Sequence, residues 1–109
     1  MTSWKIAAAV ALTLAVGVTR MAAAGKGDAA KGKEVFEQCG VCHNADSEEK
    51  KMGPGLKGLF KKAKMANGKK PTDDAVRAII NNGGNGMPAY AEILSDEEKD
   101  NVIAYLKTL

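Results

Sequence analysis

The sequence predicts a small all-α protein with long loops, and three observations lead to that prediction. The chain has 109 residues, which suits one domain rather than two. Apolar residues recur at helical spacing in three stretches, each preceded by a good helix-capping residue, namely Asp28, Thr72 or Ser95. No stretch shows the alternation of apolar and polar residues that is typical of a strand. We therefore expect three to five helices and no sheet.

The first 24 residues are predicted to be a secretory signal peptide rather than part of the fold. Lys5 supplies a positive charge, residues 6–18 are uncharged, and the alanines at 22–24 suit a cleavage site. The uncharged run is shorter than the ~20 residues with which a helix crosses a bilayer. We expect cleavage to leave a domain of residues 25–109 that does not span a membrane. The alternative is an uncleaved membrane anchor.

The charge of the chain gives no support for nucleic-acid binding. The whole chain has 16 basic and 13 acidic residues, a formal net charge of +3. Removing Lys5 and Arg20 with the signal peptide leaves 14 basic against 13 acidic residues, or +1. A domain so close to neutral lacks the positive surface that a phosphate backbone requires.

The first helix is predicted between Asp28 and Cys39. Asp28 is a good N-cap, and the residues that follow it are mostly helix formers. Val35 and Phe36 follow Gly32 at three and four residues, so one face combines a small residue with apolar ones. A glycine permits close approach, so we expect this face to cross the last helix, whose apolar face matches it.

The next residues, Cys39-Gly40-Val41-Cys42-His43, carry the chemistry of the chain. The pattern C-x-x-C-H is the signal for covalent attachment of a c-type haem. The two thiols form thioethers with the vinyl groups of the porphyrin, and the histidine becomes the proximal ligand of the iron. This motif contains both cysteines of the chain and its only histidine.

Three other uses of these residues agree less well with the sequence. A dithiol redox site needs a βαβ context, and no strand pattern flanks the motif. A structural zinc site needs four ligands, mostly cysteine or histidine, and the chain has only two cysteines and one histidine. A disulfide between Cys39 and Cys42 would leave His43 without a role. One covalently attached haem c is therefore predicted.

Residues 44–71 form the least regular part of the chain, where glycines, prolines and polar runs indicate loops. A short helical turn is expected near 56–60. Leu59 and Phe60 are interpreted as walls of the haem pocket, although periodicity does not separate that role from general core packing. Eight basic residues fall within the lysine-rich segment 50–70. They are interpreted either as a solvated loop or as a positive rim that steers an acidic redox partner.

A second helix is predicted to begin after Thr72. Asp73 and Asp74 lie in its first turn, where the helix dipole favours anions. Its end is expected at Asn82-Gly83-Gly84. Its buried stripe is expected to consist of Ala75, Val76, Ile79 and Ile80.

The last helix is the best specified by the sequence. Ser95 and Glu98 form a capping box, and Asp96 and Glu97 add negative charge at its N-terminus. Its apolar stripe, at i, i+3, i+4 and i+7, comprises Val102, Tyr105, Leu106 and Leu109.

The residues alone leave the second axial ligand open among three methionines. A second histidine ligand is excluded within one chain, since His43 is the only histidine. Met52 lies only nine residues after His43, in the segment expected on the proximal side. Met65 lies in the lysine-rich segment, and Met87 precedes a proline. Thioether ligation would raise the reduction potential and make the protein an electron carrier, whereas an open position would permit catalysis or gas binding.

The chain resembles the class I c-type cytochromes, in particular the small soluble single-haem bacterial and algal type. The resemblance covers residues 25–109. It rests on the following residues, in this order and spacing: Gly32 and Phe36, Cys39-x-x-Cys42-His43, Gly53-Pro54-Gly55-Leu56-x-Gly58-Leu59, Gly86-Met87-Pro88-Ala89-Tyr90, Leu94-Ser95-Asp96-Glu97-Glu98, and Val102-Ile103-Ala104-Tyr105-Leu106.

This resemblance implies roles for particular residues. Met87 is expected to be the distal ligand, and the backbone carbonyl of Pro54 is expected to accept a hydrogen bond from the second ring nitrogen of His43. Gly32 and Phe36 are expected to meet Val102 and Tyr105 where the N- and C-terminal helices cross. Tyr90 and Tyr105 are interpreted as packing residues.

The function expected on these grounds is one-electron transfer between protein redox partners, without catalysis on a substrate. We expect a monomer in the periplasm or another extracytoplasmic compartment, because haem attachment and the signal peptide both point to export. One alternative is a membrane-tethered or subunit cytochrome domain of a larger oxidoreductase. Another is a haem peroxidase or gas-binding protein in which Met87 is displaceable.

Overall fold

The computed structural model describes residues 27–109, and the predicted signal peptide with its cleavage site lies outside the described residues. The described residues form three α-helices: α1 (Ala29–Phe36), α2 (Asp73–Asn82) and α3 (Asp96–Leu106). Short 3₁₀ turns lie at Cys39–Val41 and Leu59–Lys61. Between residues 27 and 109 the only β-type pairing is an isolated bridge between Gly84 and Met87. The predicted all-α class is confirmed.

Each helix begins at the residue that the sequence predicted. The Asp28 side chain accepts hydrogen bonds from the backbone N–H groups of α1, and Thr72 accepts one from Ala75. Ser95 and Glu98 form the complete capping box of α3. Gly83 ends α2 with φ of 62°, a backbone conformation that favours glycine.

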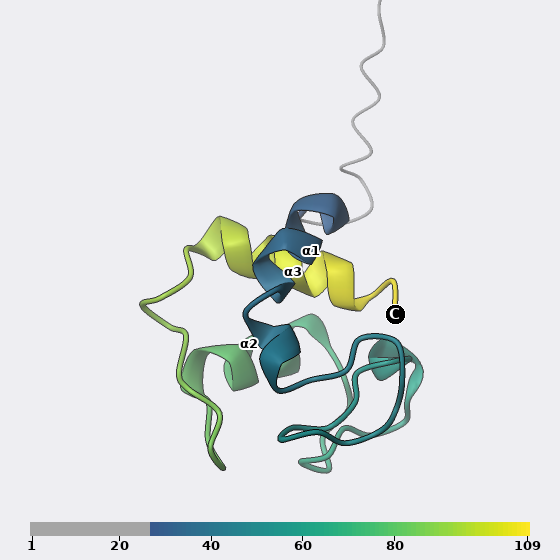
Figure 1. The fold of residues 1–109 in the computed structure, drawn as a ribbon. Helices are drawn as coiled ribbons and strands as arrows, with labels where there is room; N and C mark the ends of the chain where they lie inside the picture. Colours follow the sequence, from purple (N-terminus) through teal and green to yellow (C-terminus); the bar gives the residue numbers. More distant parts are fainter. Residues whose placement is uncertain (1–26) are drawn as a thin grey trace, which may run out of the picture.

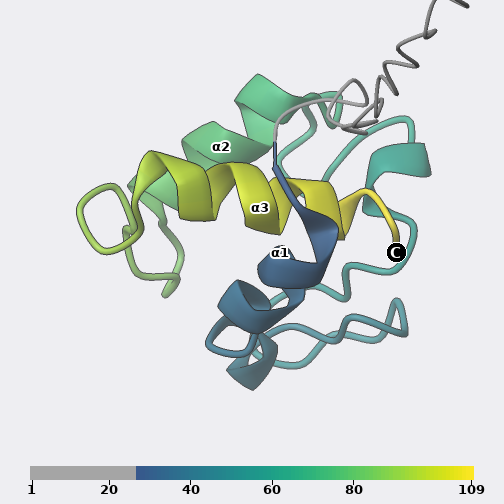
Figure 2. The same cartoon turned by 90° about the horizontal axis from the view of Figure 1, so that it is seen from above.

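The N- and C-terminal helices α1 and α3 pack across each other, as Figures 1 and 2 show from two directions. The crossing is centred on Gly32, where an added Cβ would overlap the backbone carbonyl of Asn101 and lie 2.8 Å from Cβ of Tyr105. The rings of Phe36 and Tyr105 meet beside it, with centroids 5.3 Å apart. Asn101, which the sequence did not single out, accepts a 2.7 Å hydrogen bond from the N–H of Asp28.

Helix α2 packs against the other side of α3 (Figure 1). Val76 and Ile80 are its buried residues, whereas Ala75 and Ile79 are half-buried. Arg77 pairs with Asp100 and so connects the two helices on their polar sides. Within the described part of the chain, the eight buried apolar side chains form one core: Phe36, Met65, Val76, Ile80, Leu94, Val102, Ile103 and Leu106.

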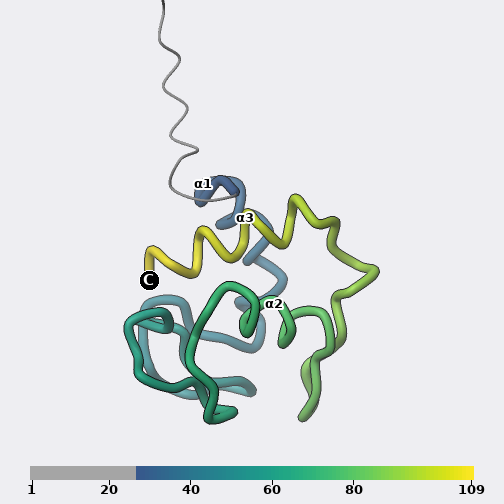
Figure 3. Tube along the Cα trace, turned by 180° about the vertical axis from the view of Figure 1, so that it is seen from behind, coloured from purple at the N-terminus to yellow at the C-terminus, as the bar shows by residue number. Residues whose placement is uncertain are grey.

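Two long connections extend from this helical layer to the same side, as the tube in Figure 3 shows. One runs from the 3₁₀ turn at Cys39–Val41 to α2, and the other, residues 83–94, joins α2 to α3. The turn expected near 56–60 lies at Leu59–Lys61, because Gly58 adopts a left-handed φ of 71° just before it. None of the helices within residues 27–109 is both long and apolar enough to cross a bilayer.

Candidate haem-binding site

A cavity lies between the helical layer and the two connections. The lining is almost entirely apolar, and the polar groups that face it are few, as in most cofactor pockets. Its walls are formed by Phe36, Cys39, His43, Leu56, Ile80, Met87, Tyr90, Val102 and Leu106.

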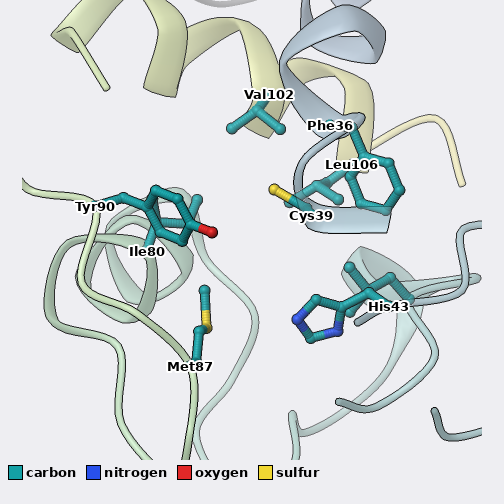
Figure 4. A pocket seen from close by; sticks show the side chains of 9 residues that line it. Phe36, Cys39, His43, Ile80, Met87, Tyr90, Val102 and Leu106 are labelled. Atoms are coloured by element: carbon teal, nitrogen blue, oxygen red, sulfur yellow. The ribbon is translucent and has the colours of Figure 1, made fainter. Parts of the chain in front are cut away.

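His43 and Met87 lie on opposite sides of this cavity, and both side chains point into it (Figure 4). Cys39 begins the 3₁₀ turn that follows α1, and His43 lies just after this turn, whereas Met87 and Tyr90 come from the connection between α2 and α3. The cavity is therefore lined by residues that lie far apart in the sequence. An imidazole on one side and a thioether on the other form a donor set suited to haem iron.

The imidazole of His43 is fixed from behind by the following segment. Its Nδ1 lies 2.8 Å from the carbonyl oxygen of Pro54. Because a carbonyl oxygen only accepts, Nδ1 carries the proton, and Nε2 is left with its lone pair for a metal. Gly53 adjoins the ring, since a Cβ there would lie 2.8 Å from Nδ1. The N–H of Gly53 also bonds to the carbonyl of Cys42 at 2.8 Å.

The two cysteines differ in their surroundings. The Cys39 sulfur lines the cavity, whereas Cys42 lies outside its lining, with Sγ 3.8 Å from Sδ of Met52. Burial and, secondarily, the Cys42 thiol raise the pKa of the Cys39 thiol above its usual value. Both sulfurs are free rather than joined in a disulfide. Their placement beside His43 fits attachment of a porphyrin at this wall of the cavity.

The structure separates the three candidate methionines. Met87 lines the cavity opposite His43, but Met65 is part of the hydrophobic core, with 8% exposure, and does not line it. Met52 is 78% exposed, beside Cys42. Among residues 27–109 no group of three or more His, Cys, Asp or Glu side chains is placed to hold a metal ion.

One prediction about the pocket walls needs correction. Leu59 and Phe60 do not line the cavity; they pack against the core, and Nζ of Lys107 lies 5.6 Å from the centre of the Phe60 ring. Leu56 takes their place in the wall. Tyr90 packs against the core, as interpreted from the sequence, and its hydroxyl also points into the cavity (Figure 4). Burial first, and then the cysteine thiols, raise the pKa of Tyr90.

Comparison with known proteins finds similarity over nearly the whole described region. Residues 27–106 match the family model described as cytochrome C oxidase, cbb3-type, subunit III. A protein named cytochrome c6 from Leptolyngbya boryana is 39% identical over 80 residues, covering 72% of this chain and 89% of that protein. Cytochrome c6 from Thermosynechococcus vestitus is 33% identical over 103 residues, covering 90% of this chain and 83% of that protein.

A solved structure has a similar fold. The structure of cytochrome c6 from the diatom Phaeodactylum tricornutum superimposes with a TM-score of 0.59 at 30% sequence identity. The alignment covers 75% of this chain and 93% of that one.

Proposed function

The chain belongs to the class I c-type cytochromes, and from that premise we propose that it is an exported one-electron carrier with His43 and Met87 as axial ligands. As a member of this family it carries one covalently attached haem c, which supplies reversible one-electron chemistry when bound. It is an electron carrier rather than an enzyme. The single observation that supports the ligand assignment is that His43 and Met87 face each other across one apolar cavity.

The protein residues set the properties of this centre. Cys39 and Cys42 are the attachment points, and the Pro54 carbonyl holds the His43 imidazole in one orientation and increases its basicity. The Met87 thioether favours the reduced state and raises the potential. The apolar walls exclude water, so both oxidation states keep nearly the same surroundings.

Equivalent substitutions at two methionines test the assignment. Met87→Leu should abolish the iron–sulfur charge-transfer absorption of the oxidised holoprotein, because leucine conserves volume but offers no sulfur. Met65→Leu should keep this band, since Met65 lies in the core outside the cavity. A band that survives in Met87→Leu would exclude Met87 as the ligand.

The docking surface proposed for redox partners surrounds Cys42. Val41 is 72% exposed and Met52 is 78% exposed, so apolar surface is available next to a haem attachment point. Lys50 and Lys51, in the lysine-rich segment 50–70, are also exposed there. This combination suits a small, transient contact with an acidic redox protein, in which charge mainly accelerates encounter. We propose that the carrier docks as a monomer.

Export is proposed from the signal peptide predicted in residues 1–24. The carrier would then act in the periplasm or another extracytoplasmic compartment. N-terminal sequencing of the exported holoprotein tests this proposal: a start at Gly25 supports cleavage, and an intact Met1 supports a membrane anchor.

A second candidate function is that of a cytochrome subunit within a larger oxidoreductase. The observation that favours it is the family model, whose description names an oxidase subunit. Size-exclusion chromatography of the native protein from a mild detergent extract distinguishes the two. The carrier should elute alone, and co-elution with other subunits would favour the complex.

A further inference from the structure

Lys99, in the first half of α3, is a buried cation that the proposed function does not use. It is 5% exposed, whereas most lysines of the chain are exposed. Burying an ammonium group is unfavourable unless the group is hydrogen-bonded or paired. Its Nζ donates to the carbonyl oxygen of Ala91 at 3.0 Å, and Oδ1 of Asp96 lies 3.8 Å away. Because the Asp96 side chain is 93% exposed, the bond to Ala91 is the closer and better-shielded compensation.

Ala91 belongs to residues 83–94, the connection that carries Met87 (Figure 1). Its N–H donates to the carbonyl of Asn81 in α2 at 3.3 Å. The neighbouring N–H of Tyr90 donates to the carbonyl of Ile80 at 2.9 Å. The peptide groups of Ala91 are therefore held by α2 on one side and by Lys99 of α3 on the other.

Side chains fix this connection by apolar packing and by one polar bond: Leu94 is buried in the core, and Lys99 bonds to Ala91. Within residues 27–109 the bond from Lys99 is the only side-chain hydrogen bond that reaches residues 83–94 from outside them. At the other end of the connection, Gly84 and Met87 exchange backbone hydrogen bonds of 2.9 Å with each other, so that turn is held by its own backbone. Movement of Met87 away from the cavity as part of the connection is thus opposed by the bond at Ala91.

We propose that Lys99 is a positioning residue that keeps residues 83–94 closed over the cavity, and so keeps Met87 on the iron. This inference rests on the proposed ligation by His43 and Met87. An external ligand can bind only while the distal position is open, so its binding rate reports the open fraction. Losing a charge-assisted hydrogen bond in the closed state increases that fraction.

The substitution Lys99→Met tests the role of the ammonium group while retaining a long apolar side chain. The change removes the cost of burying an ammonium group but leaves the Ala91 carbonyl without its donor. We therefore expect a modest fall in the thermal midpoint of the holoprotein. The rate at which the reduced holoprotein binds carbon monoxide should nevertheless rise about tenfold or more, as expected for losing a hydrogen bond to a charged group.

The matched control is Lys107→Met, the same change at another lysine near the end of α3. Nζ of Lys107 lies 2.8 Å from Asp73 in α2, so this variant loses an interhelical ion pair but no bond to residues 83–94. Its carbon monoxide binding rate should stay within about twofold of the parent. If Lys99→Met does not accumulate as holoprotein, Lys99→Gln can replace it in the test, because the shorter amide side chain also fails to reach Ala91.

Several results would decide against the positioning role. An unchanged rate in the Lys99 variant, with the iron–sulfur band intact in the parent, would overturn it. Equal rate increases in the Lys99 and Lys107 variants, each matching its loss of thermal stability, would show a merely structural role. If the parent itself lacks the band and binds carbon monoxide rapidly, the proposed ligation fails instead.

Discussion

Replacing Gly32 by alanine should destabilise the protein, although alanine is the better helix former. In an ordinary helix interior this change would stabilise by roughly 0.5–1 kcal/mol. Gly32, however, lies against α3 without room for a side chain. A Cβ would overlap the carbonyl of Asn101 and lie 2.8 Å from Cβ of Tyr105, whereas carbon atoms prefer about 3.5–4.0 Å. Helix α1 must therefore move outward by about 1 Å or deform.

The expected magnitude follows from what such a movement disturbs. Overpacking at a tight contact costs about 1–3 kcal/mol. The contact between Phe36 and Tyr105, now at 5.3 Å between centroids, and the 2.7 Å bond from Asp28 to Asn101 would both be weakened. An aromatic pair and a hydrogen bond are each worth about 1 kcal/mol. After subtracting the helix-propensity gain, we expect a net loss of about 1–3 kcal/mol.

Thermal and denaturant unfolding of the holoprotein measure this loss. For a domain of this size, 1 kcal/mol corresponds to about 4–8 °C in the melting temperature. Gly40→Ala is a suitable control, because a Cβ at Gly40 would meet the nearest atom, in the Phe36 ring, at 3.5 Å, an ordinary contact. A Gly32→Ala variant as stable as the parent would refute the close helix crossing.

Two further predictions concern the haem site and the docking surface. Gly53→Ala should push the His43 ring away from the Pro54 carbonyl and so make the imidazole less basic. The reduction potential, measured by potentiometric titration, should therefore rise. An unchanged potential would count against this contact. Lys50→Glu should slow electron transfer to an acidic partner protein in stopped-flow experiments at low salt, and the effect should be smaller at high salt. The control Lys31→Glu, on α1, should leave the transfer rate unchanged. Equal effects of the two substitutions would exclude a localised docking surface.

The helices and the attachment motif could be predicted from the sequence because their signals are local. Asp28, Thr72 and Ser95 cap helices through hydrogen bonds to residues two or three positions away, so the pattern is sufficient. Cys39 and His43 are fixed by one short motif. The crossing at Gly32 was also foreseeable, since a glycine on an apolar helix face suggests close approach.

The walls of the cavity could not be predicted in the same way, because they depend on how loops fold over long distances in sequence. Leu59 and Phe60 were placed in the wall on hydrophobicity alone, but Gly58 turns the chain and directs them to the core. Burial of Met65 in the core likewise depends on the loop around it. Periodicity does not distinguish a core residue from a pocket residue.

The role of Lys99 was missed although the sequence contains a signal for it. Lys99 precedes Val102, Ile103 and Leu106 by three, four and seven residues, so it shares the buried face of α3. A lysine at such a position either extends to water or finds a buried partner. Only the fold shows that the partner is the carbonyl of Ala91.

An anaerobic reductive titration of the holoprotein, followed by reoxidation, tests whether Met87 stays on the iron in both oxidation states. The holoprotein should take up one electron per chain in a single reversible transition. The iron–sulfur band should disappear on reduction and return in full on reoxidation, because His43 and Met87 remain the ligands in both states. Failure of the band to return, or its absence from the oxidised parent protein, would contradict a carrier that keeps Met87 on the iron.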